Sequence, residues 1–289
     1  MKPPPFEYHA PRSLGEALDA LAGTGEHGKV LAGGQSLIPM LNMRLAAPAH
    51  LIDINRLSEL AFVDVGPEGV RVGALARHAQ VERHEPAAAA QPLLGRALRL
   101  VAHPVIRNRG TVVGSLAHAD PAAELPAVLT LLRGSVRLAR PGAVRDVPAE
   151  DFFTGPLESA IDPGELAVSA FFPARPPRSG TAFREVARRH GDYALAGIAA
   201  QVVLDDDLRI TSATVACVSL GPVPLLVDVS EAVGHRPSAS ADWASAARAV
   251  RERADPDADI HATAAYRRHL AGVLTEQALR DAAREAADA

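Results

Sequence analysis

Residues 31–44 read LAGGQSLIPMLNMR, with two adjacent glycines between a short apolar run and an apolar, helix-like segment. Adjacent glycines let backbone N–H groups turn toward a ligand with no side chain in the way, as phosphate-binding loops require. We expect Ser36 to cap a helix whose first turn contains Pro39, and a helix start favours an anion. The segment therefore predicts a pyrophosphate-binding loop, although a plain turn before a helix would use the same residues. Its spacing fits neither GxGxxG nor GxxxxGK[ST].

A second loop of similar character lies at residues 106–124, which read IRNRGTVVGSLAHADPAAE. Asp120 followed by Pro121 predicts the N-cap and first residue of a helix. The side chains of this loop that could hydrogen-bond to or neutralise a diphosphate are Arg107, Arg109, Thr111 and Ser115. Two loops that could face each other favour a diphosphate ligand more strongly than either loop alone.

The composition is that of a soluble globular protein: of 289 residues, 48% are hydrophobic and 22% charged. A net charge of -4 gives no general electrostatic case for nucleic acid or a membrane surface. Apolar runs end well before the roughly 20 residues of a membrane span. The N-terminal sequence lacks the apolar core of a secretory signal. We therefore expect a cytoplasmic protein with no membrane span and no nucleic-acid partner.

The single cysteine, Cys217, excludes a disulfide within the chain. Iron–sulfur clusters usually need four thiolates, so any such cluster must belong to another polypeptide. Cys217 lies in a strand-like segment, which favours a buried, inert thiol. His103 and His118 flank the second loop, but no paired ligand spacing accompanies them, and we expect no metal site. Ser115, His118 and Asp120 lack the setting of a catalytic triad.

The segment PARPPRSG at residues 173–180 is the best linker in the chain, because it is rich in turn residues and lacks periodicity. We place a domain boundary there, which gives domains 1–175 and 176–289. Strands are expected at 29–32, 50–54, 135–139 and 165–172, a hairpin at 61–75, and helices at 13–22, 37–45, 76–84, 93–102 and 121–132. Beyond the linker the patterns predict three antiparallel strands, at 182–189, 194–204 and 209–220, and two helices, at 242–254 and 263–287.

Six blocks of the sequence, in this order, resemble the FAD-binding subunits and domains of the molybdenum hydroxylases, such as carbon monoxide dehydrogenase and xanthine dehydrogenase. The blocks are AGGQSLIPMLNMR (32–44), LIDINRL (51–57), RNRGTVVGSLAHADPAAELP (107–126), DFFTGPLES (151–159), GELAVSAFFP (164–173) and FREVARRHGDYALAGIAA (183–200). The resemblance implies an α+β fold. Its FAD-binding domain would be of the p-cresol methylhydroxylase type, with α+β subdomains at about 1–55 and 56–175. Its C-terminal α+β domain would hold a three-stranded antiparallel sheet with helices.

The resemblance also implies how FAD would be held, without a covalent bond. Residues 32–37 would wrap the diphosphate, the second loop would form the opposite wall, and Asp120 and Glu124 would accept hydrogen bonds from ribityl or ribose hydroxyls. The implied cofactor-binding residues are Ala32, Gly33, Gly34, Gln35, Ser36, Leu37, Val101, Thr111, Gly114, Ser115, Asp120, Glu124, Leu166, Arg184 and Tyr193. The last three align with positions near the flavin in relatives.

Several of these residues have an ordinary structural interpretation as well. Asp120 and Glu124 would stabilise a helix start without any ligand. Leu166 could be core, and Tyr193 a half-buried tyrosine at a strand edge. The chain also departs from the family at Val113, where glycine is usual, and a β-branched residue would be strained there if its φ were positive. Ser115 and Arg184 replace the more common Asn and Lys.

The function implied by the resemblance is electron relay by an FAD-binding medium subunit. Iron–sulfur clusters and molybdopterin would lie on a small and a large partner subunit, in a dimer of heterotrimers. No side chain of this chain would then act as a nucleophile or general base; the protein would bind FAD and tune it. A stand-alone flavoenzyme that acts directly on a small molecule is the alternative. The sequence names neither the substrate of such a complex nor the final electron acceptor.

Overall fold

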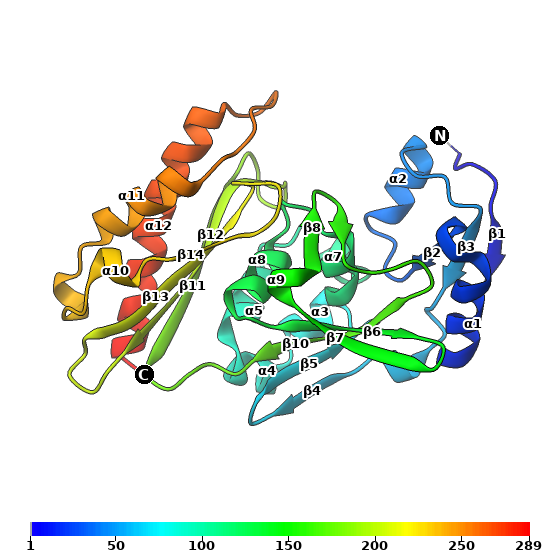
Figure 1. The fold of residues 1–289 in the computed structure, drawn as a ribbon, viewed down its shortest axis with the longest axis horizontal. Coiled ribbons are helices and arrows are strands. Elements are labelled where there is room, and N and C mark those ends of the chain that lie inside the picture. Colours follow the sequence, from blue (N-terminus) through cyan, green and yellow to red (C-terminus); the bar gives the residue numbers. More distant parts are fainter. Residues whose placement is uncertain (1) are drawn as a thin grey trace.

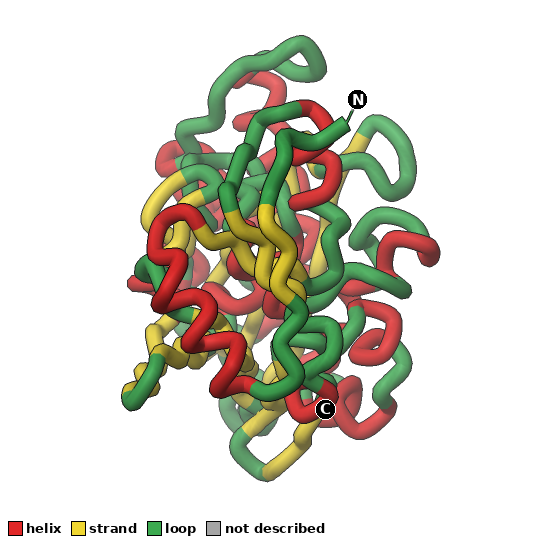
Figure 2. Tube along the Cα trace, turned by 90° about the vertical axis from the view of Figure 1, so that its right-hand side faces the viewer, coloured by secondary structure: helices red, strands yellow, loops and turns green. Residues whose placement is uncertain are grey.

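The computed structural model describes residues 2–289, and its N-terminal part is a small parallel sheet in the order β1-β3-β2 (Figure 1). Its strands are β1 (Glu7–His9), β2 (Gly28–Leu31) and β3 (His50–Asp53). Helix α1 (Leu14–Thr24) begins where the N–H of Glu16 donates to Ser13 Oγ, and Figure 2 shows it beside this sheet. The glycine pair connects β2 to helix α2 (Leu37–Met43).

The middle of the molecule is an antiparallel sheet in the order β4-β5-β10-β6-β7. Its strands are β4 (Val63–Gly66), β5 (Gly69–Gly73), β6 (Ser135–Arg140), β7 (Ala143–Pro148) and β10 (Leu166–Pro173). The helices around it are α3 (His78–Glu82), α4 (Glu85–Ala90), α5 (Pro92–Leu98), α6 (Pro104–Arg107), α7 (Val112–His118), α8 (Glu124–Leu131) and α9 (Ala149–Phe152). A two-stranded ribbon, β8 (Phe153–Gly155) with β9 (Glu158–Ser159), adjoins it. Leu98, Leu125, Phe152 and Phe172 are fully buried in its core.

The third sheet is antiparallel and follows chain order: β11 (Ser179–Ala187), β12 (Ala194–Leu204), β13 (Ile210–Val218) and β14 (Leu225–Asp228). It is followed by α10 (Ser230–Val233), α11 (Trp243–Arg253) and α12 (Ala264–Ala287). Helices α11 and α12 cover its outer face, and α8 packs on the inner face (Figure 1). Successive β11 side chains alternate between these faces: Ala182 joins the core under α12, whereas Phe183 joins the core of the middle sheet.

Three local expectations are corrected. The C-terminal sheet has four strands, not three; β14 has only four residues and follows the proline-containing turn at 221–224, so no alternating pattern marks it. Residues 112–118 of the expected loop form α7. Helix α8 begins at Glu124, because the Asp120 carboxylate accepts from the N–H of Ala122 and closes a turn before the helix.

Most of the expected helices and strands are present within a few residues of their expected ends. Cys217 is buried, and burial raises the pKa of its thiol to about 12, which confirms the inert interpretation. Within residues 2–289, no helix combines the length and apolarity needed to cross a bilayer.

Candidate cofactor site

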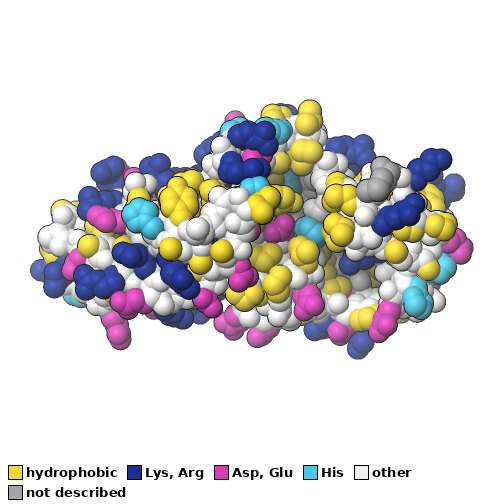
Figure 3. Space-filling model, turned by 90° about the horizontal axis from the view of Figure 1, so that it is seen from above, with side chains coloured by type: hydrophobic (Ala, Val, Ile, Leu, Met, Phe, Trp, Pro, Cys, Tyr) yellow, Lys and Arg dark blue, Asp and Glu magenta, His cyan; other side chains and the backbone are white. Residues whose placement is uncertain are grey.

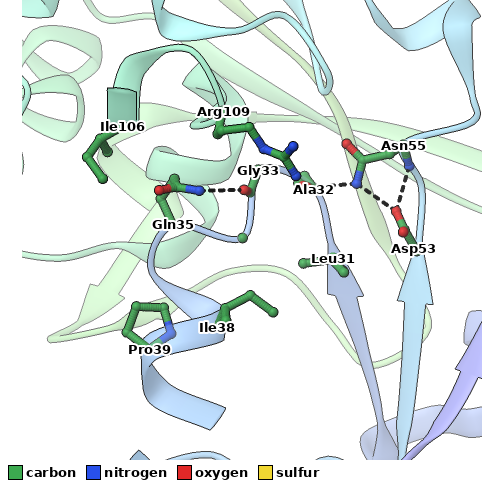
Figure 4. Close-up of a pocket in the computed structure, with 11 residues that line it drawn as sticks. Leu31, Ala32, Gly33, Gln35, Ile38, Pro39, Asp53, Asn55, Ile106 and Arg109 are labelled. Atoms are coloured by element: carbon green, nitrogen blue, oxygen red, sulfur yellow. Dashed lines mark hydrogen bonds between the residues drawn. The ribbon is translucent and has the colours of Figure 1, made fainter. Parts of the chain in front are cut away.

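The two glycine loops meet at a pocket of about 390 Å³ (Figure 4). Its lining comes from the first loop, from the end of β3 and from the segment before α7: Leu31, Ala32, Gly33, Gly34, Gln35, Ile38, Pro39, Asp53, Asn55, Ile106 and Arg109. A Cβ atom on Gly33 would lie 2.4 Å from the carbonyl oxygen of Arg109 and 2.8 Å from the Cα of Gly110. Only glycine fits at this contact, so the expectation that the loops face each other is confirmed.

The first loop presents backbone N–H groups that the protein itself does not use. Within residues 2–289, neither a backbone carbonyl nor a side chain accepts a hydrogen bond from the N–H groups of residues 33–36. Gly34 has φ +74°, a conformation that L-residues rarely adopt, and it turns this part of the loop. Consecutive N–H groups in such a turn form an anion-binding concavity. The loop therefore fits a diphosphate, although the Ser36 side chain makes no capping hydrogen bond, contrary to expectation.

A polar network fixes the loop from behind. Asn55 donates from Nδ2 to the carbonyl oxygen of Ala32 at 2.8 Å and to Asp53 Oδ1 at 2.6 Å. Arg77 donates to Asn55 Oδ1 at 2.6 Å and to the carbonyl oxygen of Arg109 at 2.7 Å. Figure 4 shows Arg109 reaching from the second loop toward the backbone of Ala32 and Gly33. The network thus fixes the position of the two loops relative to each other, and the Arg109 guanidinium faces the pocket.

The second loop continues into α7 without strain. Thr111 is its N-cap and accepts from the N–H of Gly114 at 3.1 Å. A Cβ on Gly114 would lie 2.5 Å from Thr111 Oγ1, so a larger residue here would require the Thr111 side chain to shift. Val113 is buried within the helix and has no positive φ. The strain considered for this valine is therefore absent, and the loop keeps its geometry.

Acidic side chains gather between the N-terminus of α8 and the inner face of β11. Glu124 is 8% exposed, and burial, followed by the nearby Glu185, raises its pKa to about 8. Burial raises the pKa of Glu185 to about 7, and its Oε2 atom is buried without a hydrogen-bond partner. The nearby charge of Asp120 also raises the pKa of Glu124. A buried, unpartnered carboxylate oxygen is unusual in a finished core, so these acids fit a site where a polar ligand supplies hydrogen bonds.

Tyr193 lies close to this acidic cluster. Its side chain is 65% exposed, and partial burial together with Asp120 and Glu124 raises the pKa of its hydroxyl. The β11–β12 turn that carries it packs on the middle domain, since a Cβ on Gly191 would lie 2.7 Å from His103 Cε1. Tyr193 is therefore not a core residue.

Val101, Leu166 and Arg184 lie outside both the pocket lining and the acidic cluster. Arg184 lies on the outer face of β11 and donates to Asp281 of α12 at 2.8 Å, away from Glu124 and Glu185. Leu166 is 2% exposed and lies in the core of the middle sheet. Val101 packs partly buried against that core, and its carbonyl oxygen accepts from Arg107. Their contacts with a cofactor stay predictions that this geometry does not favour.

The sequence reasoning missed several residues of the site. The prediction did not include Asp53, Asn55 and Arg77. The segment LIDIN nevertheless ends a strand with polar residues, and ligands commonly bind at the carboxyl ends of strands. Glu185 was overlooked beside Arg184 because only strand alternation, not composition, separates their faces.

Family models match both parts of the chain. Residues 4–175 match the family described as the FAD binding domain in molybdopterin dehydrogenase, and residues 181–282 match the CO dehydrogenase flavoprotein C-terminal domain. The chain is 39% identical to the 6-hydroxypseudooxynicotine dehydrogenase complex subunit alpha of Paenarthrobacter nicotinovorans, with 96% of this chain and 95% of that protein covered. It is 35% identical to the carbon monoxide dehydrogenase medium chain of Hydrogenophaga pseudoflava, at 96% and 97% coverage.

Solved structures give the same result. The chain matches carbon monoxide dehydrogenase from Hydrogenophaga pseudoflava, in a form that lacks the Mo-pyranopterin moiety of its molybdenum cofactor, with a TM-score of 0.92 and 34% identity over 98% of both chains. It matches quinoline 2-oxidoreductase from Pseudomonas putida 86 with a TM-score of 0.92 and 34% identity over 99% of both chains.

Proposed function

Since this chain belongs to the family of FAD-binding subunits of the molybdenum hydroxylases, we propose that it receives electrons from iron–sulfur centres of a partner subunit and passes them through FAD to an external acceptor. The observation that carries the proposal is the pocket between the two glycine loops, with its unused N–H groups and Arg109. Bound FAD would supply the exchange between one-electron donors and a two-electron acceptor.

The chain's own part in this function is to bind and orient the cofactor. We propose that the N–H groups of residues 33–36 and the Arg109 guanidinium hold the diphosphate, with Thr111, Gly114 and Ser115 forming the opposite wall. Asp120 and Glu124 would accept hydrogen bonds from hydroxyl groups of the ligand, and Tyr193 would cover the ring.

The partners follow from the relatives. The matched proteins are named as a medium chain or as a subunit of a dehydrogenase complex. We propose a small iron–sulfur subunit and a large molybdopterin subunit as partners, in a dimer of heterotrimers, within the cytoplasm. One buried cysteine cannot hold an iron–sulfur cluster, so this chain needs a partner for that step.

The first experiment is to purify the untagged chain without added flavin, record its visible spectrum, denature it and identify the released compound by chromatography. We expect FAD at about one per chain. A colourless protein that also takes up no added FAD would contradict the binding site. Co-purification from the native host then tests the partners. A chain that never associates with iron–sulfur and molybdopterin proteins, yet turns over a small molecule alone, would favour the stand-alone flavoenzyme.

A further inference from the structure

A second group of side chains with ligand chemistry lies on the parallel sheet, outside the lining of the pocket between the glycine loops. Glu7 and His9 stand two residues apart on β1 and so share a face, and His50 of β3 pairs with Glu7 in the register. Residues 9 and 50 are far apart in the sequence, so no spacing motif predicts the group. Figure 3 shows histidine side chains at the end of the molecule that holds this sheet.

The three side chains converge on one point. His9 Nε2 lies 3.1 Å from His50 Nδ1, Glu7 Oε1 lies 3.7 Å from His9 Nε2, and Glu7 Oε2 lies 3.5 Å from His50 Nδ1. All three residues offer one ligand atom within 4.8 Å of the others. Ligands of a tetrahedral zinc ion at 2.0–2.1 Å are separated by about 3.3 Å. The 3.1 Å between the two histidine nitrogens is close to this separation, and each Glu7 oxygen lies 3.5 or 3.7 Å from one of those nitrogens.

We propose that Glu7, His9 and His50 form a binding site for a zinc-like divalent cation, with solvent as the fourth ligand. Two imidazoles and one carboxylate suit Zn²⁺, whereas Mg²⁺ and Ca²⁺ prefer oxygen ligands alone. The imidazoles are half-buried, with side chains 28% and 29% exposed, and Glu7 is 67% exposed, so an ion can enter from solvent. Few atoms need to move, because the ligand atoms already face one another.

The site would fasten the edge of the sheet. β1 has only three residues and is the edge strand of the described sheet, so a metal bridge to β3 adds ligand bonds to a short backbone pairing. On the opposite face of β1, Tyr8 donates to Asp53 Oδ2 at 2.6 Å, and Asp53 lines the pocket between the glycine loops. The ion therefore holds the strand that supports one wall of that pocket.

The test uses the full-length, untagged, FAD-loaded protein, dialysed against micromolar Zn²⁺ and then analysed for metal. We expect one zinc per chain and a rise in Tm on zinc addition. The X-ray absorption spectrum at the zinc edge should show two imidazole ligands. The double variant His9→Gln/His50→Gln should lose the zinc and the rise in Tm. His261→Gln, which removes an exposed histidine outside the cluster, should behave like the unaltered protein.

Retained FAD and an unchanged circular dichroism spectrum will show that the double variant is folded. Zinc binding that is equal in the unaltered protein and the double variant would overturn the proposal, as would a protein that takes up no zinc. Zinc binding without a rise in Tm would contradict the proposal that the ion stabilises the attachment of β1 to the sheet.

Discussion

Gly33 and Arg109 are in backbone contact: a Cβ on Gly33 would lie 2.4 Å from the carbonyl oxygen of Arg109. The same oxygen accepts from Arg77, so it cannot move away freely. The two loops therefore form one unit, and the pocket between them depends on a residue without a side chain.

The change Gly33→Ala should lower FAD occupancy at least tenfold. The added Cβ must push the loops apart, and the N–H groups that we propose for the diphosphate would then point past it. The measurement is FAD per chain after purification, together with the Kd from flavin titration, where tenfold corresponds to about 1.4 kcal/mol.

The control for this change is Gly23→Ala in α1, where a Cβ would meet nothing within 4 Å. Alanine favours a helix, so this variant should keep its FAD and its stability. Full FAD occupancy in Gly33→Ala would show that the loops do not bind the diphosphate.

The change Asn55→Ala should weaken FAD binding and lower stability by about 1–2 kcal/mol. It leaves the carbonyl oxygen of Ala32 and one N–H of Arg77 without a partner. Flavin titration and thermal unfolding measure the two effects. Gln277→Ala, at an exposed position of α12, should change neither, and equal behaviour of the two variants would refute the role of the network.

Helices and strands are predicted from the sequence where their periodic pattern is long. Long periodic segments such as α12 and the strands β12 and β13 were expected, and the two glycine loops identified the pocket. The strand β14 was not expected, because four residues carry no period. Asp120 was misplaced because an aspartate that closes a turn and one that caps a helix look alike in sequence.

Some site residues could not be predicted because their positions depend on contacts between residues far apart in the sequence. Arg184 was chosen over Glu185, yet Asp281, about a hundred residues away, pairs with Arg184 on the outer face. The group formed by Glu7, His9 and His50 depends on the pairing of β1 with β3, which no local pattern specifies.

The change Glu285→Gln should destabilise the protein by about 2 kcal/mol. Glu285 of α12 accepts from Arg96 of α5 at 2.6 Å and from the N–H of Thr181 at 2.9 Å, so it links the two domains. Burial alone would raise its pKa, but these hydrogen bonds and the charges of Arg96 and Arg175 lower it from 4.5.

The lowered pKa of Glu285 determines how its contribution to stability changes with pH. The contribution of Glu285 is present above pH 4.5 and is lost as the pH falls through its folded-state pKa. Thermal unfolding should therefore show the variant and the unaltered protein converging in acid. Glu276→Gln, at an exposed pair in the same helix, should have almost no effect, and a loss of similar size there would contradict the link.

The change Glu124→Gln should stabilise the protein increasingly as the pH rises. Burial and the neighbouring Glu185 raise the folded-state pKa of Glu124 from 4.5 to about 8. Between these values the folded protein keeps a proton that the unfolded chain releases, so the free energy of unfolding falls with rising pH. Glutamine does not titrate, and the advantage of the variant should grow by on the order of 4 kcal/mol from acid to about pH 8. Thermal unfolding of the flavin-free protein across this range measures it, with Glu252→Gln at an exposed position as the control. An advantage that stays constant with pH would mean that Glu124 is ionised in the folded protein, and the acidic cluster would then hold no proton beside the proposed ligand.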